Sequence, residues 1–163
     1  MELLIRNFVL FFIGGWITYT DLKRHEIDHT PLIVGAIFAI PFTLFGFNDI
    51  NILQSLLGCV ILFLIFFGMT FFGMGGGDMK LMAMIGLFLG PGRGILTAVA
   101  AIYISAIFAI FIFIYKSIFK KEKKVMKSKM AMGPSIALGT IVGIYGYQYV
   151  LDWIASNIVV ISG

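Results

Sequence analysis

The chain has 163 residues, of which 60% are apolar and 12% charged, with a formal net charge of +4 and a mean hydropathy of +1.03. A soluble globular chain is about half apolar and a quarter charged, so this composition excludes an ordinary soluble protein. We expect lipid to be the solvent for most of the surface. The length predicts one transmembrane domain, residues 1–163, with room for about six spans of roughly 20 residues and no soluble module.

Apolar segments follow one another along the whole chain, each bounded by charged residues, glycines or prolines. They cover residues 3–20, 31–47, 50–72, 79–90, 95–115 and 132–151. The first ends in Thr20-Asp21-Leu22-Lys23-Arg24 without a small-residue cleavage site, which favours a membrane span over a signal peptide. We therefore predict an all-α polytopic membrane protein with about six transmembrane helices.

The basic residues between these segments predict the orientation. Lys23 and Arg24 follow the first segment, Lys80 begins the fourth, and seven lysines between residues 116 and 129 follow the fifth. All of these positions share one side, which is the cytoplasmic side because cytoplasmic loops accumulate Lys and Arg. Both termini are then predicted outside. The lysine-rich stretch joins two spans, so we assign it a topological role and predict the lipid bilayer, not nucleic acid, as its partner.

Small residues recur inside the apolar segments. Gly86 and Gly90, and likewise Gly139 and Gly143, have the four-residue spacing that lets helices approach closely. We expect packing interfaces at both pairs. The only cysteine, Cys59, lies within an apolar run, which excludes a disulfide framework and a Cys-x-x-Cys metal pair.

Two acidic residues need a functional explanation. Asp21 directly follows the first apolar segment, and Asp78 stands at the head of the fourth. An ionisable group at membrane depth costs about 2.5–3.5 kcal/mol on insertion scales and therefore indicates a functional site. Residues 79–90 make only about 18 Å of helix against a hydrocarbon core of about 30 Å. We therefore predict that Asp78 lies below the cytoplasmic surface of the membrane.

Paired carboxylates have a definite chemistry in a partly desolvated site. Two of them held close together share one proton, since both cannot be ionised. The ionised partner activates water while the protonated one polarises a peptide carbonyl, and neither step needs a metal or cofactor. Gly75, Gly76 and Gly77 leave the backbone before Asp78 open to an approaching peptide. For Asp78 alone, the alternative is an N-cap of a helix that begins at Met79.

Three other functions compete with proteolysis. His25 and His29 lie four residues apart among acidic neighbours and could bind a divalent metal, although the polar setting favours a solvated loop, and we predict no metal. A small carrier could use Asp21 and Asp78 for proton coupling, which predicts acids nearer the middle of a span. A non-catalytic assembly subunit could pack its glycine-rich faces against partners. That last alternative leaves Asp78 unexplained.

Three motifs resemble one known family. The stretch Gly75-Gly76-Gly77-Asp78-Met79-Lys80-Leu81 resembles the G-x-G-D motif of intramembrane aspartyl proteases, and more closely the G-G-G-D-x-K-L form of type IV prepilin peptidases. Asp21-Leu22-Lys23-Arg24 is similar to the family's aspartate after the first span. Residues 133–139, Gly-Pro-Ser-Ile-Ala-Leu-Gly, resemble the G-P-x-x-A-x-G stretch that opens its last span.

The resemblance implies that Asp21 and Asp78 are the catalytic carboxylates. It also implies an aspartic endopeptidase of the cell membrane that removes the leader from type IV pilin-like precursors at the cytoplasmic face. Lys80 either supports this site or is a topology signal. The chain has Ile27-Asp28-His29 where the family usually has Ile-Pro-Asn. It also lacks the cysteine-containing methylation domain of larger members, so we expect processing without methylation.

Overall fold

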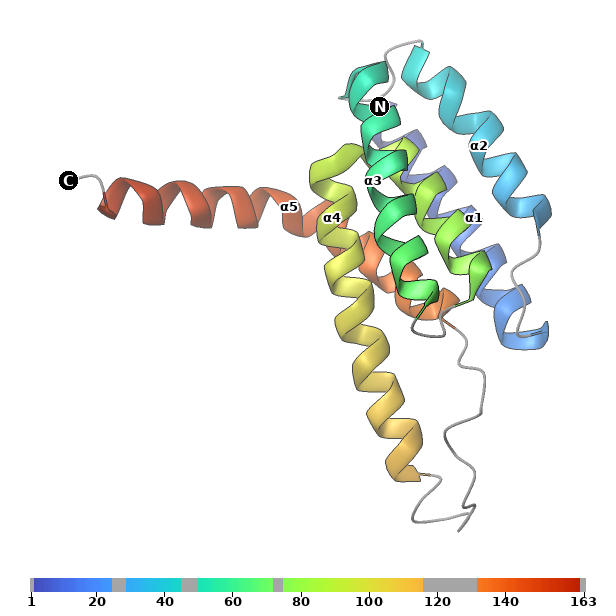
Figure 1. The fold of residues 1–163 in the computed structure, drawn as a ribbon. Helices are drawn as coiled ribbons and strands as arrows, with labels where there is room; N and C mark the ends of the chain where they lie inside the picture. The colour runs from blue at the N-terminus through green and yellow to red at the C-terminus, as the bar shows by residue number, and fades with distance from the viewer. Residues whose placement is uncertain (1, 25–28, 45–49, 72–74, 116–131, 162–163) are drawn as a thin grey trace.

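The structure is a computed structural model that describes residues 2–24, 29–44, 50–71, 75–115 and 132–161. Within these ranges the regular elements are all helices, which confirms the predicted all-α class. The helices are α1 (Glu2–Arg24), α2 (His29–Leu44), α3 (Ile52–Thr70), α4 (Gly76–Tyr115) and α5 (Gly133–Ile161). They form a bundle from which the C-terminal part of α5 extends to one side (Figure 1).

Two helices continue past the ends of the apolar segments that predicted them. The first segment was expected to end at Thr20, but α1 continues through Asp21 to Arg24, where no glycine or proline interrupts it. The last segment was expected to end at Leu151, but α5 continues to Ile161. Apolar composition marks the part of a helix that avoids water, whereas the helix itself ends where backbone hydrogen bonding stops.

The predicted count of six spans is not confirmed. Residues 79–90 and 95–115, which were expected to be separate spans, form two helical parts of α4 on either side of a break at Gly90. Among the described residues, only α3 and α4 are both long and apolar enough to cross a membrane. Helix α4 is broken at Gly90, where φ is +69° and ψ is −175°. The chain reverses direction there (Figure 1), so that a Cβ at Gly94 would lie 3.9 Å from the Gly86 Cα.

The break at Gly90 yields a stability prediction. This combination of dihedral angles is essentially restricted to glycine, so Gly90→Ala is expected to destabilise the protein by about 1–3 kcal/mol. The matched control is Gly68→Ala on α3, where a Cβ would meet nothing within 4 Å. That change should be neutral or stabilise by about 0.5–1 kcal/mol. The stability of both variants is measured in detergent by the loss of the helical circular dichroism signal on heating. Equal unfolding midpoints for the two variants would contradict this role of Gly90.

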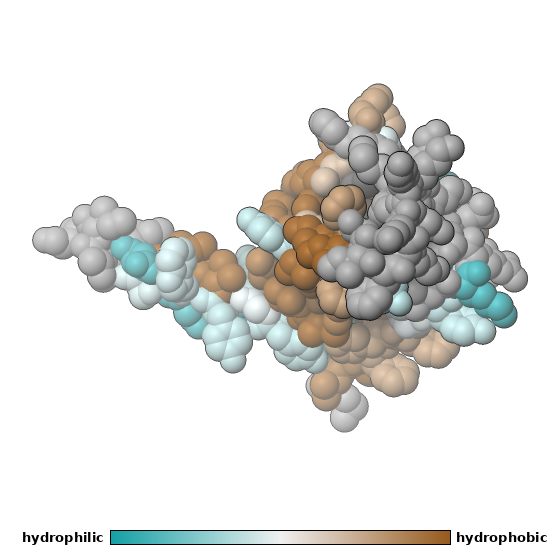
Figure 2. Space-filling view, turned by 90° about the horizontal axis from the view of Figure 1, so that it is seen from below, coloured by the Kyte–Doolittle hydropathy of each residue, from teal (hydrophilic) through white to brown (hydrophobic). Residues whose placement is uncertain are grey.

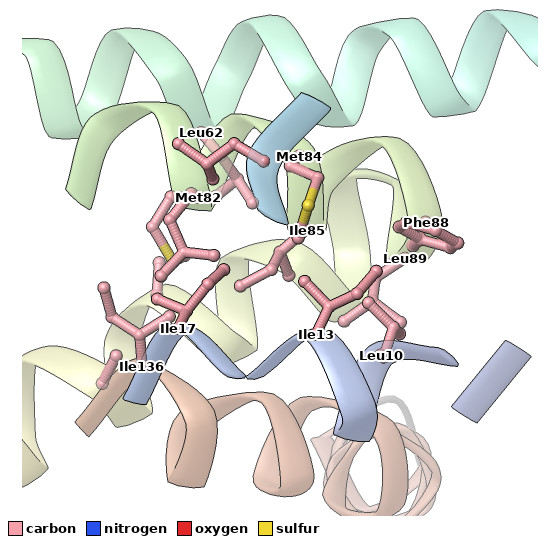
Figure 3. Packing of buried hydrophobic residues seen from close by; sticks show 14 of the residues in the cluster. Leu10, Ile13, Ile17, Leu62, Met82, Met84, Ile85, Phe88, Leu89 and Ile136 are labelled. Atoms are coloured by element: carbon pink, nitrogen blue, oxygen red, sulfur yellow. The ribbon is translucent and has the colours of Figure 1, made fainter. Parts of the chain in front are cut away.

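Buried residues of α4 form the centre of the core, and helices α2, α3 and α5 contact α4. From α1, Leu10, Ile13 and Ile17 are all buried, and their spacing places them on one helical face. Figure 3 shows these side chains turned toward α4, with Leu62 of α3 on the opposite side of α4. The described part of α1 therefore packs on α4 through long side chains, which places the C-terminal end of α1 beside the start of α4.

The glycine pairs lie at close helix contacts, as their spacing predicted. A Cβ on Gly86 would collide with the Gly58 carbonyl of α3, and a Cβ on Gly58 would lie 2.6 Å from the Gly90 carbonyl carbon. On α5, a Cβ on Gly139 would lie 2.8 Å from the Ala101 nitrogen, and one on Gly143 would collide with Thr97. These contacts bring α3 and α5 against the two halves of α4.

Large apolar side chains cover much of the outer surface. Phe8 is 72% exposed, Leu53 69% and Phe111 68%, and each of them lies on a different helix of the bundle. In Figure 2 apolar residues occupy most of the coloured surface of the bundle. Exposure on this scale is costly in water and favourable in lipid, so it is the surface expected of a protein surrounded by lipid.

Candidate active site

Asp21 is buried near the C-terminal end of α1 and is held by the start of α5. Its side chain is 5% exposed, and its Oδ2 accepts a hydrogen bond of 2.7 Å from the Gly133 amide. Gly133 is the first residue of α5, so its amide has no carbonyl partner within that helix. Asp21 satisfies this amide and places a carboxylate at the positive end of the α5 dipole.

The close contact between α1 and α5 depends on glycine at position 133. A Cβ there would lie 2.9 Å from Asp21 Oδ2 and 3.1 Å from Asp21 Cβ, which is shorter than real Cβ contacts. Pro134 follows, and its missing N–H costs nothing in the first turn of a helix. Backbone hydrogen bonding begins with the Ile136 amide, which donates to the Met132 carbonyl at 3.0 Å. Residues 132–136 therefore form a tight start of helix around Asp21.

Asp78 lies in the first turn of α4 and is 7% exposed. The prediction that it could be the N-cap of a helix beginning at Met79 is wrong, because α4 begins at Gly76. The Asp78 amide donates to the Gly75 carbonyl at 3.1 Å and so closes the first turn. Glycines before Asp78 can adopt helical angles, so the helix begins earlier than the apolar pattern indicated.

The structure brings Asp21 and Asp78 together from different helices. Their carboxyl groups are close enough for a direct electrostatic repulsion between them. Both are also mostly shielded from water by the surrounding protein. Two acids in this situation hold a single negative charge more easily than two. Such a pair can supply a base and an acid at the same time.

The other predicted site residues lie around Asp78. Gly75 and Gly76 are exposed, and a Cβ on Gly76 would meet nothing within 4 Å. A Cβ on Gly75 would lie 3.2 Å from Asp78 Oδ2, so this backbone passes close to the carboxyl group. Gly77 is partly buried, and Lys80 is exposed one turn further along α4. The glycine backbone beside Asp78 is therefore open on one side.

The sequence patterns did not predict one contact of the candidate site, the hydrogen bond from the Gly133 amide to Asp21. The signal that could have found it is the Gly-Pro opening of the last apolar segment, since proline is favoured in the first turn of a helix and glycine permits a close approach of another chain segment. Other predictions fall outside the described residues. These are His25 of the alternative metal site, Ile27-Asp28 of the altered motif and the lysine-rich stretch at residues 116–129.

Comparison with known proteins gives one match. The model of the type IV leader peptidase family matches residues 8–115, more than half of the chain, and this range includes both Asp21 and Asp78. Neither a curated protein nor a solved structure matches the chain.

Proposed function

Because the chain belongs to the type IV leader peptidase family, we propose that it removes the leader from type IV pilin-like precursors with Asp21 and Asp78 as the catalytic pair. Membership makes it a protease of prepilin substrates, and together with its apolar helices makes it an integral membrane protein. The observation that supports this use of the two residues is that both are buried and near enough to interact electrostatically, at the end of α1 and the start of α4.

In the proposed reaction Asp21 carries the negative charge. Its Oδ2 accepts a hydrogen bond from the Gly133 amide, which holds the carboxylate in position. Asp21 removes a proton from water, and the water oxygen bonds to the carbonyl carbon of the scissile peptide. Asp78 donates its proton to the carbonyl oxygen. A proton then passes from Asp21 to the leaving nitrogen, the carbon–nitrogen bond breaks, and Asp78 recovers its proton from the intermediate.

The backbone of Gly75 and Gly76 gives the substrate a place to lie. Both residues are exposed beside Asp78, and no side chain obstructs a peptide that approaches Gly76. An extended peptide could pair its own amides with this backbone and so hold its scissile carbonyl over the carboxyl pair. We assign Gly77 to the same segment, and Lys80 to its outer edge.

The proposed location is the cytoplasmic membrane, with the carboxyl pair at its cytoplasmic face. Lys23 follows Asp21 by two residues and Lys80 follows Asp78 by two, and both lysine side chains are exposed. Two positive charges near the carboxyl pair support a cytoplasmic position by the positive-inside rule. Both termini then lie outside. In this proposal residues 1–163 form one transmembrane peptidase domain.

The alternatives have less support. A proton-coupled carrier would place its acids near the middle of its helices, whereas Asp21 lies near the end of α1 and Asp78 at the start of α4. A non-catalytic subunit would not need two buried acids that repel each other.

Co-expression with a type IV prepilin tests the proposal. The wild-type protein is expected to shorten the precursor at one peptide bond, which mass spectrometry of the product locates just before its hydrophobic helix. The double variant Asp21→Asn/Asp78→Asn should leave the precursor at full length while accumulating in the membrane to the same level. Cleavage by the double variant would contradict the assignment of the carboxyl pair, and no cleavage by the wild type would contradict the function.

A further inference from the structure

An apolar groove of about 200 Å³ lies between α1, the start of α4 and α5. A cavity of about 150 Å³ is enough to bind a benzene ring, so this space can accept a large apolar side chain. Six of its lining residues carry the inference: Gly14 and Gly15 of α1, Leu81 and Met84 of α4, and Gly133 and Ala137 of α5.

The groove lies beside the carboxyl pair, although neither Asp21 nor Asp78 lines it. Gly133 lines it and also donates its amide to Asp21. Leu81 lines it one turn after Asp78 on α4. From Gly15 the groove runs away from Asp21 along α1, beginning about 9 Å from that residue at 1.5 Å per residue. One end of the groove therefore lies next to the candidate active site, and the rest follows the apolar parts of all three helices.

The lining selects an apolar occupant. Among the lining residues, all of which the structure describes, Thr140 has the one polar side chain. Its hydroxyl already donates to the Ile136 carbonyl of its own helix at 2.8 Å. A polar or charged segment would therefore lose its hydrogen bonds to water and find no replacement here.

The small residues on both walls select a helix as the occupant. A Cβ on Gly15 would meet nothing within 4 Å, and a Cβ on Gly14 would reach the nearest atom, Ala137 Cβ, at 3.8 Å. Gly14 faces Ala137 at an ordinary contact distance and Gly15 faces open space, so the α1 wall offers a shallow face at Gly15 against which another helix can pack closely. The backbone polar groups of such an occupant must be paired within itself, as they are in a helix.

We propose that this groove binds the apolar helix that follows the scissile bond of the substrate, an inference that rests on the proposed function. The helix packs on Gly14 and Gly15 with a large side chain in the cavity, and its N-terminal end reaches the carboxyl pair. The scissile bond then lies over Asp21 and Asp78, and the polar leader stays on the side of the exposed glycines. Specificity for a bond immediately before an apolar helix follows from the position of the groove beside the carboxyl pair.

The first test fills the groove and compares it with a matched change elsewhere. Gly15→Leu places a side chain in the groove, whereas Gly68→Leu places one in open space on α3, since neither Cβ has a neighbour within 4 Å. With a type IV prepilin in membranes, Gly15→Leu is expected to lower kcat/KM about tenfold relative to Gly68→Leu, mainly by raising KM. If the two variants had equal kcat/KM and the wild type were active, the proposed role of the groove would be wrong, whereas the proposed function would stand.

The second test does not depend on how Gly15→Leu folds. A photoreactive amino acid replaces Leu138, an exposed residue that lines the groove, and in a control replaces Leu64, an exposed residue of α3. Both proteins carry Asp78→Asn, so that the prepilin stays uncleaved. Irradiation should join position 138 to the apolar helix of the prepilin several times more than position 64. Adducts of position 138 only with lipid, or only with a second copy of the chain, would overturn the proposal.

Discussion

Replacing Asp78 with asparagine is expected to lower the rate of prepilin cleavage by about 10²–10⁴-fold, and Asp21→Asn should have an effect of the same order. Asparagine keeps the shape of the side chain but cannot transfer the proton. Because the two carboxyl groups act as one unit, the double variant should be little worse than either single variant. First-order rates of precursor cleavage in membranes, measured over hours for the variants, provide the comparison.

The matched control is Asp152→Asn on α5. Asp152 is exposed, in contrast to the two buried acids, so its change removes one charge without touching the carboxyl pair. We expect a wild-type rate. If the effects of Asp21→Asn and Asp78→Asn multiplied in the double variant, the two residues would act in independent steps and the shared-proton reaction would be wrong.

Gly133→Ala has the second largest expected effect. Its Cβ would lie 2.9 Å from Asp21 Oδ2, so either the carboxylate or the start of α5 must move. Either shift weakens the 2.7 Å hydrogen bond between the Gly133 amide and Asp21. Misplacing a catalytic group by about 1 Å can cost about 10²-fold, and the loss should appear in kcat. Single-turnover cleavage at saturating enzyme isolates this step from substrate binding.

Gly146→Ala on the same helix serves as the control for Gly133→Ala. A Cβ at Gly146 would lie 3.5 Å from Val142 Cγ1 and 3.8 Å from Leu96 Cδ2, which are ordinary contacts. Its cleavage rate should match that of the wild type. If Gly133→Ala also cleaved at the wild-type rate, the proposed role of the Gly133 amide in positioning Asp21 would be wrong.

Much of the helical architecture could be predicted from local patterns. The apolar segments located the helices, and the spacing of Gly139 and Gly143 located the contact of α5 with Thr97 and Ala101. The helix ends could not be predicted in the same way. At Asp21 the chain leaves an apolar run, but α1 continues because the residues up to Arg24 still form helical hydrogen bonds. At Gly90 the non-helical backbone angles of one residue reverse the chain between the two helical parts of α4.

The sequence by itself determined that Asp21 and Asp78 are exceptional, because an acid at the edge of an apolar segment is costly to place in a membrane. It could not decide whether the two meet, since that depends on how α1 packs against α4 through Ile13, Ile17 and their neighbours. Only the tertiary structure placed the Gly133 amide on Asp21, more than one hundred residues away in the chain. The first backbone amides of any helix have no carbonyl partner within that helix. The tertiary fold decides which side chain accepts their hydrogen bonds.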